Sequence, residues 1–365
     1  MKRVRIFNLL ILVLSLFLVS NLKFSGASDI VLTGDAGYRR LERVTDEDLG
    51  FDVKHYFDKG ESYRDGNFYP QEVNILEVPY ASNARIVSFG NLQNSQWTLT
   101  TVGDLVKLYE ATHPNQKVLA AVNADFYDIN GNGNFPYQTS NPLVTDGEYF
   151  RTSGSNAVGI RKASGTSALV GGSPTRTNKM ILSIYDENDQ IIKEFQIDKV
   201  NSYPSANETS VFYALYDANS RIVPVTLVST SSMYVVENAE YALPNGANDF
   251  YGRGVISSIA PTTLAKGQFA IVTNNEEIKQ YLSVDVKIRV QHKLTGIFEG
   301  VDNVTGHNAK FLEKGEYNPH PNSSNNTYAR HPRTVVGVKR DGTIVLAIID
   351  GRQEAKGKYG MYGNE

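Results

Sequence analysis

The sequence contains no cysteine among its 365 residues. Disulfide bonds, zinc sites with thiolate ligands, cysteine nucleophiles and lipid-modified cysteines are therefore excluded. A chain of this length can instead be stabilised by its hydrophobic core. An excess of positive charge is also lacking, since the formal net charge is −3 and the pI is about 6.1. The Lys and Arg residues form no basic stripe, so we do not expect nucleic acid as a partner.

The N-terminus has the pattern of an export signal. Three basic residues among the first five are followed by an almost uninterrupted apolar run, Ile6–Ser20, and by small residues at 25–27. The run is shorter than the about 20 residues that span a bilayer. We therefore expect residues 1–27 to be a cleaved signal peptide and the protein to be secreted or at the cell surface. The alternative is an uncleaved anchor, so that the membrane is contacted through this segment only.

The composition favours β-structure, because the chain contains 21 Tyr and 16 Phe residues. Tyr-rich exported proteins often bind sugars, but half-buried strand positions are the favoured explanation of these residues. A helix is expected over 101–113, where Thr101 and Asp104 can cap its N-terminus. Alternating or apolar segments predict strands at 71–78 (at a sheet edge), 85–89, 179–185, 191–197, 221–228 and 284–290.

These segments predict an α+β fold with mixed, mostly antiparallel β-sheets and a few packed helices. No repeat or long linker divides the exported chain, so we expect a single large domain. Within it, residues 28–95 form an N-terminal region of unknown role. The residues that could take part in binding or catalysis lie in 96–365.

The first candidate site follows a buried strand. Residues 117–127 are predicted as a strand whose apolar core, 118–122, is covered on both faces. Asn123 and Asp125 then point to one face, because side chains alternate along a strand. Ligands often bind at such strand ends. The alternative is that both residues only hold the next loop.

The next loop partly matches a calcium-binding pattern. Asp128, Asn130, Asn132 and Gly133 occupy relative positions 1, 3, 5 and 6. The twelfth position is Thr139, where a bidentate Glu is required. Asn-Gly pairs are also common turn formers. A turn is favoured, with calcium bound by the first three residues as the alternative.

An Asp-Gly pair at 341–342 separates two apolar strands, 333–340 and 343–350. Asp-Gly is typical of a two-residue hairpin turn. With that turn, Arg333 lies opposite Asp350 on one face, and the arginine two residues after Asp350 points to the same side. This strand register therefore predicts an Arg/Asp cluster at the end of the hairpin. A structural ion pair is the alternative.

Together, these motifs resemble the phosphodiester glycosidase family, the relatives of N-acetylglucosamine-1-phosphodiester α-N-acetylglucosaminidase. The resemblance covers roughly residues 100–365 and has several elements in the family's order. They are Asn123-Ala-Asp125-Phe-Tyr127, Pro142-Leu-Val-Thr-Asp146-Gly147, Gly306-His-Asn-Ala-Lys-Phe-Leu312-Glu-Lys-Gly315, Arg333-Thr-Val-Val-Gly337 and Asp350-Gly-Arg352-Gln353.

The resemblance implies hydrolysis of a sugar-1-phosphodiester. No set of metal ligands emerges from the sequence, so we expect a reaction without a metal or cofactor. Its partner is a phosphodiester-linked carbohydrate, such as a cell-wall polymer or exopolysaccharide. Such a site needs Arg forks for the phosphate and a carboxylate near the anomeric carbon. The catalytic candidates are Asp350, Asp125 and Arg333, and the substrate-binding candidates are Asn123, Arg352, Thr334 and Gly351. His331 is expected on a solvent-facing loop, with a position within reach of the site as the alternative.

Two departures from the family pattern affect these expectations. Asn123-Ala-Asp125 replaces the commoner Asn-Gly, and the chain stops at Glu365 before the family's glycine-rich loop. We therefore expect a truncated family domain, with low activity and an apolar patch exposed near Val345, Ala347 or Ile349. The alternative function is a non-catalytic glycan-binding or cell-surface assembly protein. An ordinary glycosidase, which needs two carboxylates but no Arg pair, is disfavoured.

Overall fold

The computed structural model describes most of the chain beyond the N-terminal segment. The described residues are 31–33, 36–93, 96–132, 136–151, 156–161, 169–172, 178–213, 225–226, 232–242, 249–259, 263–264, 268–318, 329–363 and 365. The expected signal peptide, residues 1–27, lies outside this set, as does most of the expected strand 221–228. Within it, no helix is long and apolar enough to cross a membrane.

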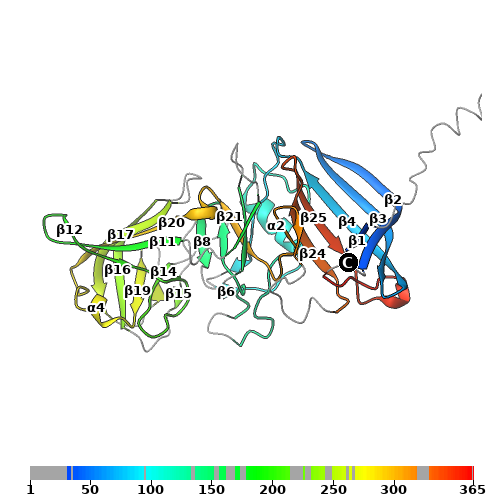
Figure 1. Ribbon diagram of the computed structural model, residues 1–365. Helices are drawn as coiled ribbons and strands as arrows, with labels where there is room; N and C mark the ends of the chain where they lie inside the picture. Colours follow the sequence, from blue (N-terminus) through cyan, green and yellow to red (C-terminus); the bar gives the residue numbers. More distant parts are fainter. Residues whose placement is uncertain are drawn as a thin grey trace, which may run out of the picture.

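Three main sheets follow one another along an elongated molecule (Figure 1). At one end, the six-stranded sheet has the order β1 (Val31–Thr33), β2 (Ala36–Gly50), β3 (Val53–Arg64), β4 (Asn67–Val78), β25 (Ile344–Ile349), β24 (Arg333–Val338). The central five-stranded sheet has the order β10 (Leu169–Gly172), β9 (Ala157–Ile160), β21 (Asn303–Gly306), β7 (Leu143–Thr145), β8 (Glu148–Arg151).

The eight-stranded sheet lies at the other end. Its order is β12 (Ile191–Gln196), β11 (Asn178–Tyr185), β20 (Lys287–Leu294), β17 (Asp249–Ser258), β16 (Ser232–Ala242), β19 (Phe269–Thr273), β14 (Thr209–Tyr213), β13 (Lys199–Val200). All its pairs are antiparallel except β13 with β14. Three two-stranded ribbons complete the described strands: β5 (Leu92–Gln93) with β6 (Gln96–Trp97), β15 (Val225–Thr226) with β18 (Thr263–Leu264), and β22 (Leu312–Glu313) with β23 (Glu316–Tyr317).

The prediction of mostly antiparallel sheets is confirmed, but the α+β class is not well supported. The described residues contain two α-helices, α2 (Val102–Thr112) and the single-turn α4 (Glu276–Lys279). The expected cap of α2 is present, because the Thr101 hydroxyl accepts the Asp104 N–H at 3.1 Å. Strand signals therefore dominate this chain, and helices contribute little to its layers.

Two expected strands did not form. Residues 117–124 pair with no strand among the described residues, although 118–122 are apolar. The Val118 N–H is bonded by the Glu110 carboxylate at 3.0 Å, so a side chain replaces a ladder partner. Likewise, the expected strand 85–89 is irregular, because Ser88 bonds the side chains of Asn303 and Thr145. The apolar composition of these two segments suggested strands, but it does not reveal which groups their backbones bond.

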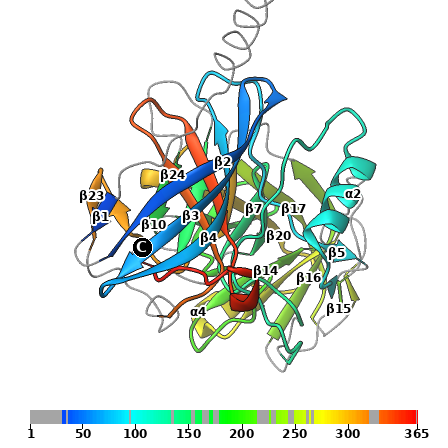
Figure 2. The ribbon, with the colours of Figure 1, turned by 90° about the vertical axis from the view of Figure 1, so that its right-hand side faces the viewer.

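The six-stranded sheet combines strands from the N-terminal region, β1 to β4, with β24 and β25 from the C-terminal part of the sequence. The expected edge strand β4 is an interior strand between β3 and β25. Figure 2 shows the long strands β2, β3 and β4 alongside β24. The motif-bearing hairpin of β24 and β25 is therefore built onto the N-terminal region.

An apolar patch was expected near Val345, Ala347 or Ile349. Ile349 is buried against Val73 and Met361, and Val345 and Ala347 are half-buried. On the neighbouring edge strand β24, Val335 and Val338 are 43% and 44% exposed, but they point to opposite faces of the sheet.

The main core lies between the eight-stranded and five-stranded sheets, and includes Leu182 and Val290 of the first and Val144 of the second. His292 is completely buried there, stacked on Tyr149 and hydrogen-bonded to the Tyr213 hydroxyl. Burial lowers the pKa of His292 from 6.5 to about 3. The histidine is therefore neutral in the folded protein.

This burial predicts a loss of stability in acid. His292 is neutral in both states above pH 6.5, but below this only the unfolded chain readily takes up the proton. The free energy of unfolding should fall between pH 6.5 and 3 by up to about 1.4 kcal/mol per pH unit. Urea denaturation at pH 7 and 4.5 should show a smaller acid loss for His292→Gln than for the wild type. His113→Gln is the control, and equal losses in all three proteins would contradict the assignment.

Candidate functional site at the end of the β24–β25 hairpin

The predicted register of the motif hairpin is wrong by one residue. Arg333 lies opposite Ile349, not Asp350. The loop has three residues, because the Lys339 N–H bonds the Thr343 carbonyl at 2.8 Å. Asp341 accepts the Thr343 N–H at 2.9 Å and Gly342 has a φ of +85°. A left-handed glycine is typical of three-residue hairpin loops, and a one-residue shift moves side chains to the opposite face.

Arg333 and Asp350 are consequently separate. The Arg333 guanidinium donates to the Met361 carbonyl at 2.9 Å and to the Ala329 carbonyl at 2.7 Å. Asp350 accepts from Lys358 at 2.7 Å, and Lys358 also forms a 2.7 Å ion pair with Glu72. These two bonds raise the pKa of Lys358. The predicted Arg333–Asp350 pair is therefore replaced by a Lys-centred contact.

The hairpin nevertheless gathers charged side chains at its open end. We define the hairpin-end cluster as His331, Arg333, Asp350, Arg352 and Lys358. Arg352 is not extended as expected but has a φ of +58°. Its guanidinium reaches back to His331 Nδ1 at 3.0 Å. Sequence reasoning missed the roles of His331 and Lys358, because both contacts depend on turns in the chain.

The electrostatics of the hairpin-end cluster favour an anion. The pKa of Arg333 is lowered by burial and then by the charge of Arg352, so the two guanidinium groups are close enough to repel. Partial burial and the charges of Arg352 and Arg333 also lower the pKa of His331, which keeps it neutral. Among the contacts of the described residues, no ion pair compensates Arg352. A bound anion would reduce this repulsion.

The Asn123 motif meets the hairpin across 211 residues of sequence. The Thr334 hydroxyl donates to the Asn123 side-chain carbonyl at 2.8 Å. Two substrate-binding candidates are thus in direct contact. The glycine motif is also adjacent, because a Cβ at Gly351 would lie 2.6 Å from the backbone nitrogen of Pro332. Six of the seven sequence candidates therefore lie at or beside the hairpin end, and only Asp125 does not.

Asp125 instead holds the following loop. Its carboxylate accepts the N–H groups of Phe126 at 2.7 Å and Asn141 at 3.0 Å, and the Asn141 side chain at 2.7 Å. Burial raises the pKa of Asp125 despite these bonds. A Cβ at Gly306 would lie 2.0 Å from its carboxylate. This geometry favours the loop-holding alternative for Asp125.

The possible calcium loop is a tight turn in the described residues. The Gly131 N–H approaches the Asp128 carbonyl at 3.3 Å, and Asn130 and Asn132 are exposed. No group of three or more His, Cys, Asp or Glu side chains suited to a metal occurs in the described part of the chain.

A small cavity of about 60 Å³ lies elsewhere, between the six-stranded and five-stranded sheets. Its lining includes Tyr80, Arg85, Arg161, Asp302 and Asn303. One oxygen of Asp302 is buried without a hydrogen-bond partner, and burial followed by the charge of Asp146 raises the Asp302 pKa.

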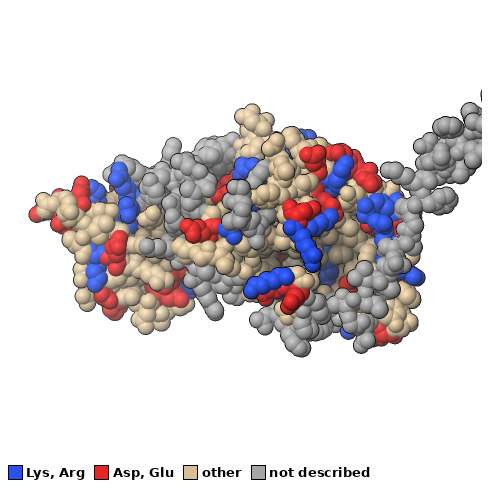
Figure 3. Space-filling model, turned by 45° about the horizontal axis from the view of Figure 1, so that its top comes forward, with Lys and Arg blue, Asp and Glu red and all other residues tan. Residues whose placement is uncertain are grey.

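Charges over the rest of the visible surface are mixed. In Figure 3, Lys and Arg side chains are interspersed with Asp and Glu, and no large area of one sign forms on this face.

The structure thus defines a β-rich protein with an arginine-containing candidate anion site. Residues 227–365 match the phosphodiester glycosidase family, which confirms the resemblance for this part of the chain. The match includes β24, β25 and the whole hairpin-end cluster, but not Asn123 or Asp125. No curated protein matches the sequence.

The first of two similar solved structures supports the fold alone. A hypothetical protein from Synechocystis is similar with a TM-score of 0.54 and 13% identity, over 92% of this chain and 66% of that chain. A Burkholderia pseudomallei protein named "Putative exported protein" has a TM-score of 0.49 and 15% identity, over 82% of this chain and 65% of that chain. This chain therefore spans just under two thirds of the length of either protein.

The contact between Gly306 and Asp125 gives a testable prediction. Gly306→Ala places a methyl group against the Asp125 carboxylate and should lower the free energy of unfolding by about 1–3 kcal/mol. Gly337→Ala is the matched strand control, because its Cβ meets nothing within 4 Å. Urea denaturation of both variants would measure the difference. Equal stability of the two variants would show that Asp125 is not tightly packed against Gly306.

Proposed function

We propose that this chain is an exported hydrolase that cleaves a sugar-1-phosphodiester bond, of the N-acetylglucosamine-1-phosphodiester type, in a cell-surface glycoconjugate. One observation carries the proposal: Arg352 turns back to His331, two residues before Arg333, so that both arginines lie at the open end of a hairpin within the region matched by the family. Two guanidinium groups near a neutral histidine suit a phosphate better than an uncharged glycoside.

The two arginines contribute differently to phosphate binding. Arg333 is half-buried and fixed by two backbone carbonyls. Arg352 is exposed and is bonded to His331. A phosphodiester oxygen can accept from both planar forks, which Lys cannot imitate. Because His331 is neutral, its ring does not repel the charge of Arg352. The ring also places a polar group beside the bound phosphate.

Asp350 is the better placed carboxylate for the sugar. Its side chain is 36% exposed and follows the last residue of β25, whereas Asp125 is enclosed by three hydrogen bonds. We assign Asp350 as nucleophile, or as base for a water molecule, at the anomeric carbon. The hydrogen bond from Lys358 orients the Asp350 carboxylate. The phosphate monoester is a good leaving group, so strong general acid assistance is unnecessary.

A glycan-binding protein without catalysis is the second candidate. The observation in its favour is the same Lys358 contact, because a carboxylate held by an ammonium group is a weaker nucleophile. Both candidates require the arginines for binding, but only the hydrolase requires Asp350 for turnover.

The proposed function predicts a specific pattern of activity. Arg333→Lys and Arg352→Lys should each lower kcat/KM for a sugar-1-phosphodiester on the order of 10- to 100-fold, because bidentate charge-assisted bonds are lost. Arg340→Lys, in the loop at the other end of the hairpin, is the matched control and should retain full activity. Released sugar would be measured by chromatography, with circular dichroism to verify folding.

Asp350→Asn separates the two candidate functions. For a hydrolase, this variant should bind the substrate but lose turnover. Substrate binding without turnover by the wild type would support the glycan-binding candidate. Full phosphodiester turnover in both Lys variants would remove the arginines from the mechanism.

A further inference from the structure

The last described residues form a strap across the six-stranded sheet. We define the C-terminal strap as residues 358–363 together with Glu365. Met361 packs on Val73 and Ile349. The Gly360 carbonyl accepts from the Gln71 side chain at 2.9 Å. The strap is thus attached to strands of the N-terminal region as well as to the motif hairpin.

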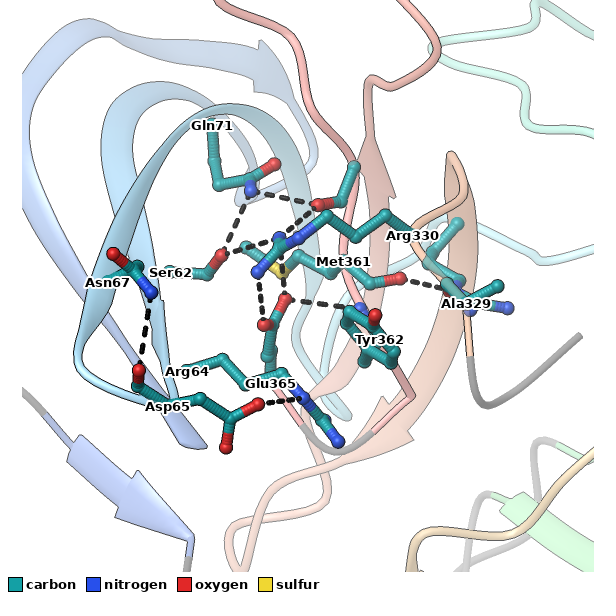
Figure 4. Close-up of polar contacts among 12 residues, drawn as sticks. Ser62, Arg64, Asp65, Asn67, Gln71, Ala329, Arg330, Met361, Tyr362 and Glu365 are labelled. Atoms are coloured by element: carbon teal, nitrogen blue, oxygen red, sulfur yellow. Dashed lines mark hydrogen bonds and ion pairs between the residues drawn. The ribbon is translucent and has the colours of Figure 1, made fainter. Parts of the chain in front are cut away.

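Arg330 is the main polar anchor of the C-terminal strap (Figure 4). It donates to both Glu365 carboxylate oxygens, at 2.6 and 3.0 Å, and to the Gly360 carbonyl at 2.8 Å. The same guanidinium donates to the Ser62 hydroxyl at 3.1 Å and lies 3.5 Å from the Tyr69 ring centre. The Arg330 side chain is 15% exposed and that of Glu365 is 0% exposed.

The other side of the strap contacts the hairpin-end cluster. His331 and Met361 form an antiparallel bridge, with N–H to carbonyl distances of 3.0 and 3.3 Å. The Met361 carbonyl also accepts the Arg333 Nε–H at 2.9 Å. A Cβ at Gly360 would lie 2.6 Å from the His331 carbonyl oxygen, so the two segments are in close contact. Displacement of the strap would therefore release Arg333 and move His331.

We propose that Arg330 is a positioning residue, which orients Arg333 and His331 for phosphate through the C-terminal strap. This inference rests on the proposed function of the hairpin-end cluster. It also assigns a role to the N-terminal region, because Ser62, Tyr69 and Gln71 hold Arg330 and Gly360. The buried ion pair is not itself a phosphate site, since Glu365 already occupies the Arg330 fork.

Arg330→Gln and Glu365→Gln test the anchor, and Arg39→Gln is the matched control. Arg39 lies on the same sheet, pairs with Glu61 and stacks on Phe68 at 4.8 Å. It makes no contact with the strap among the interactions of the described residues. Glu365→Gln keeps a neutral hydrogen-bonding group and provides a milder variant should Arg330→Gln not fold.

The first measurement is hydrogen exchange of the Arg333 Nε–H, followed by nuclear magnetic resonance without any ligand. The two anchor variants should exchange on the order of tenfold faster, because the bond to the Met361 carbonyl opens more often. Arg39→Gln should match the wild type. Unchanged exchange in both anchor variants would overturn the positioning role, whatever the protein's activity.

The second measurement is the affinity for inorganic phosphate, followed by the pH titration of the His331 ring. Phosphate should raise the His331 pKa in the wild type and in Arg39→Gln. The anchor variants should bind phosphate on the order of tenfold more weakly. Equal phosphate affinity in wild-type and anchor variants would reject the inference while leaving the proposed site intact. Absence of any phosphate effect in the wild type would reject the proposed site, and with it the functional part of the inference.

Discussion

The pairing of β25 with β4 is the interaction on which the candidate site depends. It holds the motif hairpin against the N-terminal strands through a ladder from Ile344–Val78 to Ile349–Val73. Main-chain hydrogen bonds fix the direction of β25. Apolar contacts hold its last residue, Ile349, against Val73 and Met361. Asp350 and Arg352 follow directly after this ladder. Their positions therefore depend on a region of the chain that carries none of the family motifs.

Local features of this fold could be predicted from the sequence, and long-range features could not. Thr101 and Asp104 predicted the start of α2 correctly, because capping involves residues three positions apart. The hairpin was also located correctly, but its register was not. Asp341 binds the Thr343 N–H and Gly342 adopts a left-handed conformation, which adds a third residue to the loop. The apolar run 118–122 predicted a central strand, although pattern alone cannot supply a pairing partner.

The candidate site shows the same division. Its composition was largely predicted, since Arg333, Thr334, Arg352 and Asn123 lie at or near one end of the hairpin. Its pairings were not, because Lys358 holds Asp350 and His331 holds Arg352. Both partners come from segments that turn back towards the hairpin, which no short sequence window reveals. The assignments to phosphate and sugar remain proposals, and they depend on these pairings rather than on the predicted Arg–Asp contact.

The β4–β25 ladder also has a consequence for folding during synthesis. Its partners are separated by 266 to 276 residues, so β4 is made long before β25. Contacts of such high sequence separation form slowly. Until β25 arrives, one edge of β4 is unpaired, and an open strand edge is a surface on which chains aggregate. The charged residues along β2 and β3 and the proline at position 70 in β4 would keep the waiting strands soluble. The candidate site is thus assembled only when β25 reaches strands that were made long before it.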